Sequence, residues 1–227
     1  MTTPNRAALL TKLHRNLKKF YKPAPVAHHQ PVLESMLMAS CLEDSTPAAA
    51  EHIFTTLKNL FFDWNEVRVS TIKELSEAMQ GLHDPTAAAT RLKGVLQHVF
   101  ESDYSFDLES LKKQNLGQAI KRLEKIESAS PFVVAYTVQT ALGGHAIPLD
   151  QGSLSALVIL GIISEAEAAQ RSVPGLERVI PKSKGQEFGS LLHQLGAELN
   201  AGPYSQSVRE RFLSLAPNCN GLTMTSF

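Results

Sequence analysis

The stretch Ala141-Leu-Gly-Gly-His-Ala-Ile-Pro-Leu-Asp150-Gln-Gly-Ser153 follows two helical patterns that are separated by a very short break. Its adjacent glycines, Gly143 and Gly144, predict a turn. Asp150 stands directly before an apolar run with helical spacing, and aspartate is a favoured N-cap residue. The sequence therefore predicts the order helix, hairpin, helix, Gly-Gly turn, and an aspartate at the start of a further helix.

The break before this stretch is itself a helix-hairpin-helix signal. Leu108 to Ile126 has helical spacing, with a basic face on its polar side. Ser130-Pro131 supplies an N-cap followed by a first-turn proline, so a second helix is expected from Phe132 to about Leu142. The turn that connects the two helices then consists of about residues 127–129.

Helical periodicity dominates the rest of the chain, and no sustained run alternates between apolar and polar residues. The sequence thus predicts an all-α protein. Dipeptides such as Thr46-Pro47 and Asp84-Pro85 mark further helix starts. The other expected helices cover residues 9–20, 32–42, 47–61, 71–79, 85–100, 150–163, 165–170, 188–199 and 207–215.

With 227 residues and 43% hydrophobic content, the chain is long enough for one large domain or two small ones with a real core. Its longest apolar run, residues 154–163, is roughly half the ~20 residues needed to cross a bilayer. We expect no membrane association and a cytoplasmic location, associated with the nucleoid if the source is prokaryotic. Cys41 and Cys219 lie far apart and predict neither a disulfide framework nor a zinc site.

The formal net charge is zero, but the charges are segregated along the chain. Residues 1–30 carry six Lys and Arg and no acid, whereas residues 31–109 carry five basic and thirteen acidic side chains. Residues 110–145 are again basic, with five Lys and Arg against two acidic side chains. Because nucleic-acid binding depends on Lys and Arg at phosphates, the basic segments are the ones that could serve it.

Several stretches resemble, in order, the endonuclease III-like helix-hairpin-helix DNA glycosylases, over roughly residues 31 to 215. Pro31 to Asp44 resembles the family's early helix, and Gly81-Leu82-His-Asp-Pro resembles its leucine-bearing loop. Leu123 to Phe132 takes the place of the hairpin, Ile147-Pro-Leu-Asp150 that of the Val-Asp-Thr stretch, and residues 188–200 that of the late helix.

The resemblance implies a set of site residues. Asp150 would be the catalytic carboxylate, which stabilises positive charge on the deoxyribose or orients the attacking water. Leu82 would wedge into DNA beside a flipped base. The remaining expected DNA contacts lie at the hairpin, on Lys121, Arg122, Lys125, Ser128 and Ser130.

Departures from the family pattern are chemically informative. Ser128 and Ser130 stand where the family hairpin has glycines, which let the backbone approach a phosphate closely. Phe132 stands at the place of the Schiff-base lysine, and it cannot attack a sugar carbon. Cys41 replaces a glutamine that fills the gap left by the flipped base. The four cluster cysteines are missing, so we expect no iron-sulfur cluster, and no histidine spacing indicates a metal site.

We therefore expect two helical lobes, residues 31–140 with the hairpin near 127–131, and residues 1–30 plus 141–227 with Asp150. The expected function is recognition of damaged or mismatched double-stranded DNA, with modest affinity, by a monofunctional glycosylase without lyase activity or cofactor. One alternative is an inactive family member that acts as a DNA-binding or protein-interaction module with an unknown partner. Another is a helical scaffold unrelated to nucleic acid, which a neutral net charge permits.

Overall fold

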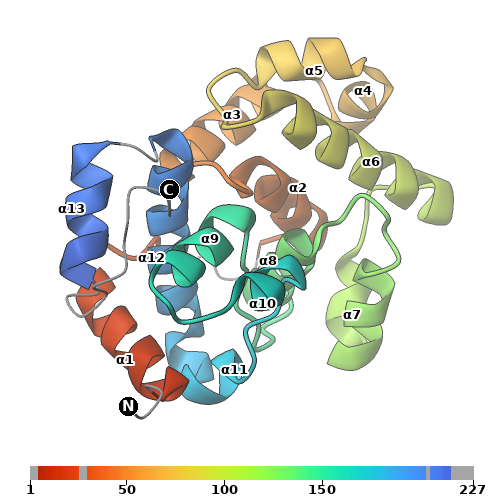
Figure 1. Ribbon diagram of the computed structural model, residues 1–227. Coiled ribbons are helices and arrows are strands. Elements are labelled where there is room, and N and C mark those ends of the chain that lie inside the picture. Colours follow the sequence, from red (N-terminus) through yellow and green to blue (C-terminus); the bar gives the residue numbers. More distant parts are fainter. Residues whose placement is uncertain (1–4, 26–29, 203–204, 216–227) are drawn as a thin grey trace. The chain divides into compact units, whose positions relative to one another are not determined.

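The computed structural model describes residues 5–25, 30–202 and 205–215, and within these ranges it contains α-helices, one 3-10 helix and no β-strand (Figure 1). The all-α prediction is confirmed. The chain divides into two compact units. Unit 1 comprises residues 1–25 and 149–227, and unit 2 comprises residues 26–148.

Unit 2 is built around α2 (Val32–Leu42), in which nine of the eleven residues are buried. A helix that is apolar on all sides belongs at the centre of a bundle, and α2 contacts α3, α6 and α8. The other helices of this unit are α3 (Pro47–Leu60), α4 (Trp64–Val69), α5 (Ile72–Ala78), α6 (Pro85–Asp103), η1 (Glu109–Lys113), α7 (Leu116–Leu123) and α8 (Pro131–Thr140).

Most helix starts in unit 2 follow the predicted caps. Thr46, Thr71, Asp84 and Ser130 each accept a hydrogen bond from a backbone N–H in the first turn. These bonds satisfy donors that have no partner inside the helix. The predicted starts at these four residues are confirmed.

The predicted continuous helix from Leu108 to Ile126 is wrong. The chain forms η1, then breaks at Gln114 and Asn115, and Asn115 caps the separate helix α7. Its side-chain oxygen accepts a hydrogen bond from the Gly117 N–H at 2.9 Å. Asparagine competes with the helical backbone in this way, which explains why an uninterrupted periodic pattern is split in two.

Unit 1 is built around α12 (Lys182–Ala201), which contacts α9 and α1 (Figure 1). Its core includes Leu154, Phe188, Leu192 and Phe212, which are fully buried. The helices of this unit are α1 (Arg6–Leu17), α9 (Gln151–Ile159), α10 (Glu165–Ala169), α11 (Leu176–Val179), α12 and α13 (Gln206–Leu215).

The sequence predicts lobe boundaries after residues 30 and 140, whereas the two units divide after residues 25 and 148. Residues 141–148 remain with unit 2 because they fold back on α8. The Gln139 side chain donates to the Ala146 carbonyl oxygen at 2.6 Å, and the Gly144 N–H donates to the Val138 carbonyl oxygen at 2.8 Å. Gly143 supplies the left-handed backbone, with φ of +63°, that this return requires.

Candidate active site

Asp150 lies at the N-terminus of α9 in unit 1 and is completely buried. Its Oδ1 accepts a hydrogen bond from the Ser153 N–H at 2.9 Å, so the predicted N-cap is confirmed. The partial positive charge of a helix N-terminus favours an anion at this position. The cap therefore contributes both a hydrogen bond and an electrostatic reason for the carboxylate to stay charged.

His193 of α12 makes the second contact of this carboxylate. Its Nδ1 lies 2.9 Å from Asp150 Oδ2, and the two side chains are 5% and 0% exposed. Burial opposes ionisation of Asp150, but the nearby His193 and the hydrogen bonds from His193 and Ser153 more than offset it. Together they lower the pKa of Asp150 from 3.8 to about 2.

A close approach of two glycines fixes the helices that carry this pair. A Cβ atom on Gly152 would lie 2.6 Å from the Gly196 carbonyl oxygen, and a Cβ on Gly196 would meet the Ser153 N. Only glycine on both helices permits this spacing between α9 and α12. Because His193 stands one helical turn before Gly196, the same contact determines where His193 meets Asp150.

This arrangement defines what the carboxylate can do chemically. Its two oxygens contact Ser153 and His193, so it is held as a fixed anion in one orientation. A preorganised negative charge in a site shielded from water stabilises positive charge that develops on a reacting group. The geometry therefore fits electrostatic stabilisation better than transfer of a proton, since a pKa of about 2 makes a weak base.

The expected hairpin is present between α7 and α8 in unit 2. The Ala129 N–H donates to the Ile126 carbonyl oxygen at 2.8 Å, which closes the turn. In the part of the chain that the structure describes, the N–H groups of Glu127 and Ser128 have no protein acceptor. These two donors are the ones that the turn can offer to a phosphate.

The two hairpin serines have structural roles. Ser130 caps α8 and donates through Oγ to Glu43 Oε2 at 2.7 Å. Glu43 is nearly buried, and its Oε2 also lies 3.1 Å from Arg91 Nε. Ser128 packs so closely against Gly94 of α6 that a Cβ atom there would clash with its side chain. The hairpin is therefore anchored to α2 and α6 through its serine side chains.

The predicted basic side chains at the hairpin differ in whether an ion pair within the protein already engages them. Arg122 forms a two-pronged ion pair with Asp103, with distances of 2.6 and 2.7 Å, and is thus already neutralised. Lys121 and Lys125 are exposed on the same segment. Of the three predicted phosphate contacts on α7 and its C-terminus, the two lysines are the ones free to bind an anion.

Leu82 is only 6% exposed and belongs to the core of unit 2. Its N–H donates to the Met79 carbonyl oxygen at 3.3 Å, and Gly81 precedes it with φ of +110°. A wedge at this position would require the loop after α5 to open. The wedge role stays a prediction, and in the present conformation Leu82 stabilises the bundle.

Phe132 and Cys41, at which the sequence departs from the family pattern, also lie in the core. Phe132 is 1% exposed and stacks on Tyr136, with ring centroids 6.2 Å apart. Cys41 is fully buried, and burial raises the pKa of its thiol to about 12. Cys219 lies outside the described residues. Among those that are described, no group of three or more His, Cys, Asp or Glu is placed to hold a metal ion.

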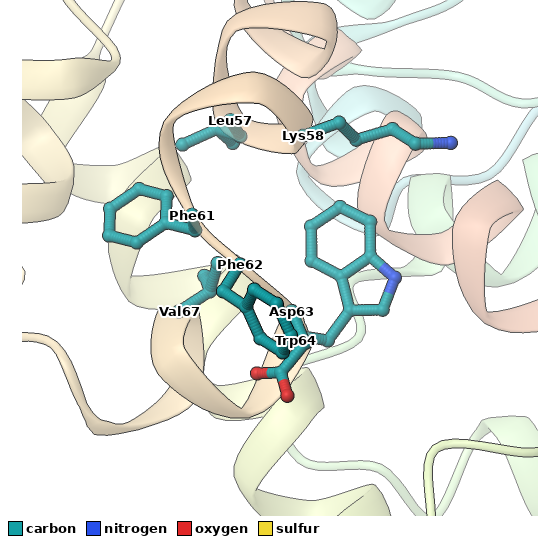
Figure 2. Close-up of a pocket in the computed structure, with 7 residues that line it drawn as sticks. All are labelled: Leu57, Lys58, Phe61, Phe62, Asp63, Trp64 and Val67. Atoms are coloured by element: carbon teal, nitrogen blue, oxygen red, sulfur yellow. The ribbon is translucent and has the colours of Figure 1, made fainter.

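A cavity of about 150 Å³ lies at the corner between α3 and α4 in unit 2 (Figure 2). Apolar side chains form most of its wall, with Lys58 and Asp63 at its edge. Phe62 is 94% exposed, whereas Phe61 is partly buried against the core of unit 2. Asp63 turns the chain sharply here by capping α4, and this leaves Phe62 outside the bundle. The other residues that line the cavity are Leu57, Phe61, Trp64 and Val67.

Sequence reasoning did not find His193, Glu43 or Arg91 as parts of a network. His193 is 43 positions from Asp150 in the chain, so no local spacing connects them. The available signal was that His193 shares one face of its helix with the small residues Gly189, Gly196 and Ala197, all of which are buried. A histidine on an apolar helix face needs a polar partner, and Asp150 is that partner.

No family model matches the sequence, and no curated protein matches it. Solved structures do share its fold. A non-covalent endonuclease III-DNA complex aligns with a TM-score of 0.60 at 16% identity, and a trapped endonuclease III-DNA covalent intermediate with 0.58 at 14%. Each alignment covers 84% of this chain and 85% of the other.

A thermostable thymine-DNA glycosylase aligns with a TM-score of 0.54 at 13% identity, over 86% of both chains. The chain therefore shares the all-α, endonuclease III-like fold of these solved structures, as the sequence predicts. No described helix is both long and apolar enough to cross a membrane.

Proposed function

We propose that this protein binds damaged or mismatched double-stranded DNA and hydrolyses the N-glycosidic bond of the affected base, with Asp150 as the catalytic residue. The observation that carries the proposal is the Asp150 carboxylate, which stays ionised although it is completely buried. Burying a charge is costly unless specific partners hold it, and His193 and Ser153 are those partners.

The chemistry follows from the charge that develops as the base leaves. Breaking the base-sugar bond places positive charge on the deoxyribose, and a fixed carboxylate lowers the energy of that state. The base leaves with the bonding electron pair, water adds to the sugar carbon, and the departing base takes up the proton that the water loses. The reaction stops there, because the buried ring of Phe132 offers no amine for a Schiff base with the opened sugar.

A specific observation favours the alternative of a catalytically inactive binding module. Both oxygens of Asp150 are already in contact with protein groups, and the carboxylate is 0% exposed. In the hairpin, Ser130 likewise donates a hydrogen bond to Glu43, and Ser128 packs against Gly94. In this alternative the Asp150–His193 pair serves only to join α9 to α12.

Measuring the release of free base distinguishes a glycosylase from an inactive binding module. Duplexes that carry uracil, mismatched thymine or alkylated purines are incubated with native protein, and the free base is quantified. Asp150→Asn should lower the release rate by about 10²-fold or more, since it removes the charge that acts in the transition state. Asparagine caps helices as well as aspartate does, so the variant should remain folded.

Asp63→Asn is the matched control, because Asp63 is an exposed N-cap at the start of α4 in unit 2. It should release base at the native rate. Equal rates for native protein and Asp150→Asn would contradict the catalytic role. Native protein that binds these duplexes but releases no base would establish the binding module instead.

A further inference from the structure

The two units carry opposite net charges. Unit 1 holds twelve Lys and Arg against seven Asp and Glu, a net charge of +5, whereas unit 2 holds ten against fifteen, a net charge of −5. The hairpin thus lies in the acidic unit, and Asp150 lies in the basic one. Attraction of a polyanion by the protein's overall field therefore favours unit 1.

Within unit 1 the positive charge is concentrated on one face of α1. Leu10, Leu13 and Leu17 are buried and attach the helix to the unit. With 3.6 residues per turn, the exposed side chains of Lys12 and Arg15 lie on the opposite side, and Lys19 is exposed in the turn that follows the helix. Lys22 follows and is also exposed; we call these four residues the α1 basic face.

Acidic side chains near α1 pair with residues outside the α1 basic face. Glu167 pairs with Arg6 at 2.8 Å, and Glu187 contacts His14 at 2.7 Å and Lys18 at 3.0 Å. Further along the chain, Glu198 accepts a hydrogen bond from the Tyr21 hydroxyl at 2.8 Å.

By contrast, no acidic partner contacts any member of the α1 basic face within the described ranges. The first acid in the sequence is Glu34, so α1 itself supplies none.

We propose that the α1 basic face binds the phosphate backbone of duplex DNA. This proposal rests on DNA as the partner of the proposed function, and it adds a binding surface in unit 1 that is separate from the hairpin. Lys12 and Arg15 lie roughly 4.5 Å apart along the helix axis, within reach of neighbouring phosphates. Flexible side chains of this kind act as point charges and position a duplex without reading its sequence.

The burial of the apolar face argues against a membrane as the partner. An amphipathic helix binds a bilayer by inserting its apolar side, whereas Leu10, Leu13 and Leu17 are at most 3% exposed in unit 1. The exposed residues of α1 are Ala8, Thr11, Lys12 and Arg15, none of which is a large apolar side chain. A regularly spaced polyanion is the partner that this surface fits.

A salt titration of duplex binding tests the proposal. Fluorescence anisotropy with a labelled undamaged duplex gives log affinity against log salt for native protein and for the variant Lys12→Gln/Arg15→Gln/Lys19→Gln. The slope should become shallower by about 0.9 for each phosphate that the variant no longer neutralises, up to about 2.7 for all three. The variant should fold normally, since these exposed side chains take part in no described ion pair.

The matched control is Lys113→Gln/Lys121→Gln/Lys125→Gln, which removes three exposed charges from the basic segment that leads into the hairpin. A smaller decrease of the slope in this control than in the α1 variant supports the α1 basic face. A native slope in the α1 variant overturns it. Failure of native protein to bind duplex at low salt, or α1-dependent binding to vesicles with anionic lipid in place of duplex, also overturns it.

Base release by the same proteins separates this proposal from the proposed function. An α1-dependent slope without base release retains the surface and rejects the catalysis. Base release that depends on Asp150, together with a native slope in the α1 variant, retains the catalysis and rejects the surface.

Discussion

Asp150 and His193 are two ionisable groups that are nearly inaccessible to water, and each is the polar environment of the other. At the scale of single residues, this pair contributes to the pH dependence of stability through the lowered pKa of Asp150. The pKa of Asp150 in the folded protein is about 2, against an ordinary value of 3.8. A lowered pKa means that the ionised form stabilises the folded state.

The stability that Asp150 contributes to the fold therefore decreases as the pH falls. The stabilisation from Asp150 is fully present above about pH 4 and is lost as the pH falls through about 2, with a size on the order of 2 kcal/mol. In urea unfolding followed by circular dichroism, Asp150→Asn should be less stable than native protein near neutral pH. That difference should shrink toward the acidic limit.

Asp63→Asn controls for removal of a capping carboxylate at an exposed position. A difference between native protein and Asp150→Asn that stays constant from neutral to acidic pH would show that the folded structure does not hold Asp150 as an anion.

At the scale of helices, the contact between α9 and α12 depends on two glycines whose hydrogen atoms face backbone. Gly196→Ala should destabilise the protein by about 1–3 kcal/mol, because its Cβ would meet the backbone of Gly152 and Ser153, which cannot rotate away. The gain in helix propensity from alanine is about 1 kcal/mol and does not offset this overlap. Urea unfolding measures the net effect.

Gly202→Ala at the C-terminus of the same helix provides the comparison. Its Cβ would lie 3.6 Å from Ser205, which is ordinary van der Waals contact, so its stability should stay close to native. Equal stability of the two variants would mean that α9 and α12 tolerate a wider spacing than the structure shows.

The accuracy of the sequence predictions also differs from element to element. Helix starts marked by a cap and a proline, such as Ser130-Pro131, depend on neighbouring residues and were predictable. The helices α4 and α11 were missed because six and four residues are too few to show a periodic pattern. The signal for α4 was Asp63 with Glu66 three positions later, which resembles a capping pair.

In the candidate site, too, local features were predictable and features that depend on packing were not. The capping role of Asp150 is local and was predictable, whereas its contact with His193 depends on how α9 packs on α12. The pairing of Arg122 with Asp103 and the burial of Leu82 likewise depend on packing within unit 2. Sequence patterns identified which residue types lie at the site, but tertiary contacts determine which of them are available.

At the scale of the whole molecule, the chain has an endonuclease III-like fold, and its cysteine content bears on one cofactor. The sequence contains two cysteines, fewer than the about four thiolates that an iron-sulfur cluster requires. Purified protein should therefore be colourless, without absorbance in the visible region from a cluster. Stoichiometric iron together with acid-labile sulfide would contradict this expectation.

Strand cleavage is the second chemistry that we expect to be absent. Phe132 is packed in the core of unit 2 against Tyr136, so the place of the family's lysine is filled by an aromatic contact. Borohydride should therefore trap no covalent complex between native protein and a duplex with an abasic site, because no amine is held there to form a Schiff base.

Phe132→Lys should not create the activity, since it would bury an ammonium group in an apolar core and destabilise the unit. Gel electrophoresis after borohydride treatment measures both proteins, with a lysine-bearing bifunctional glycosylase as the positive control. A trapped complex with native protein would contradict the monofunctional assignment. Lysine-to-glutamine variants at Lys121 and Lys125, the exposed amines beside the hairpin, would then identify the attacking group.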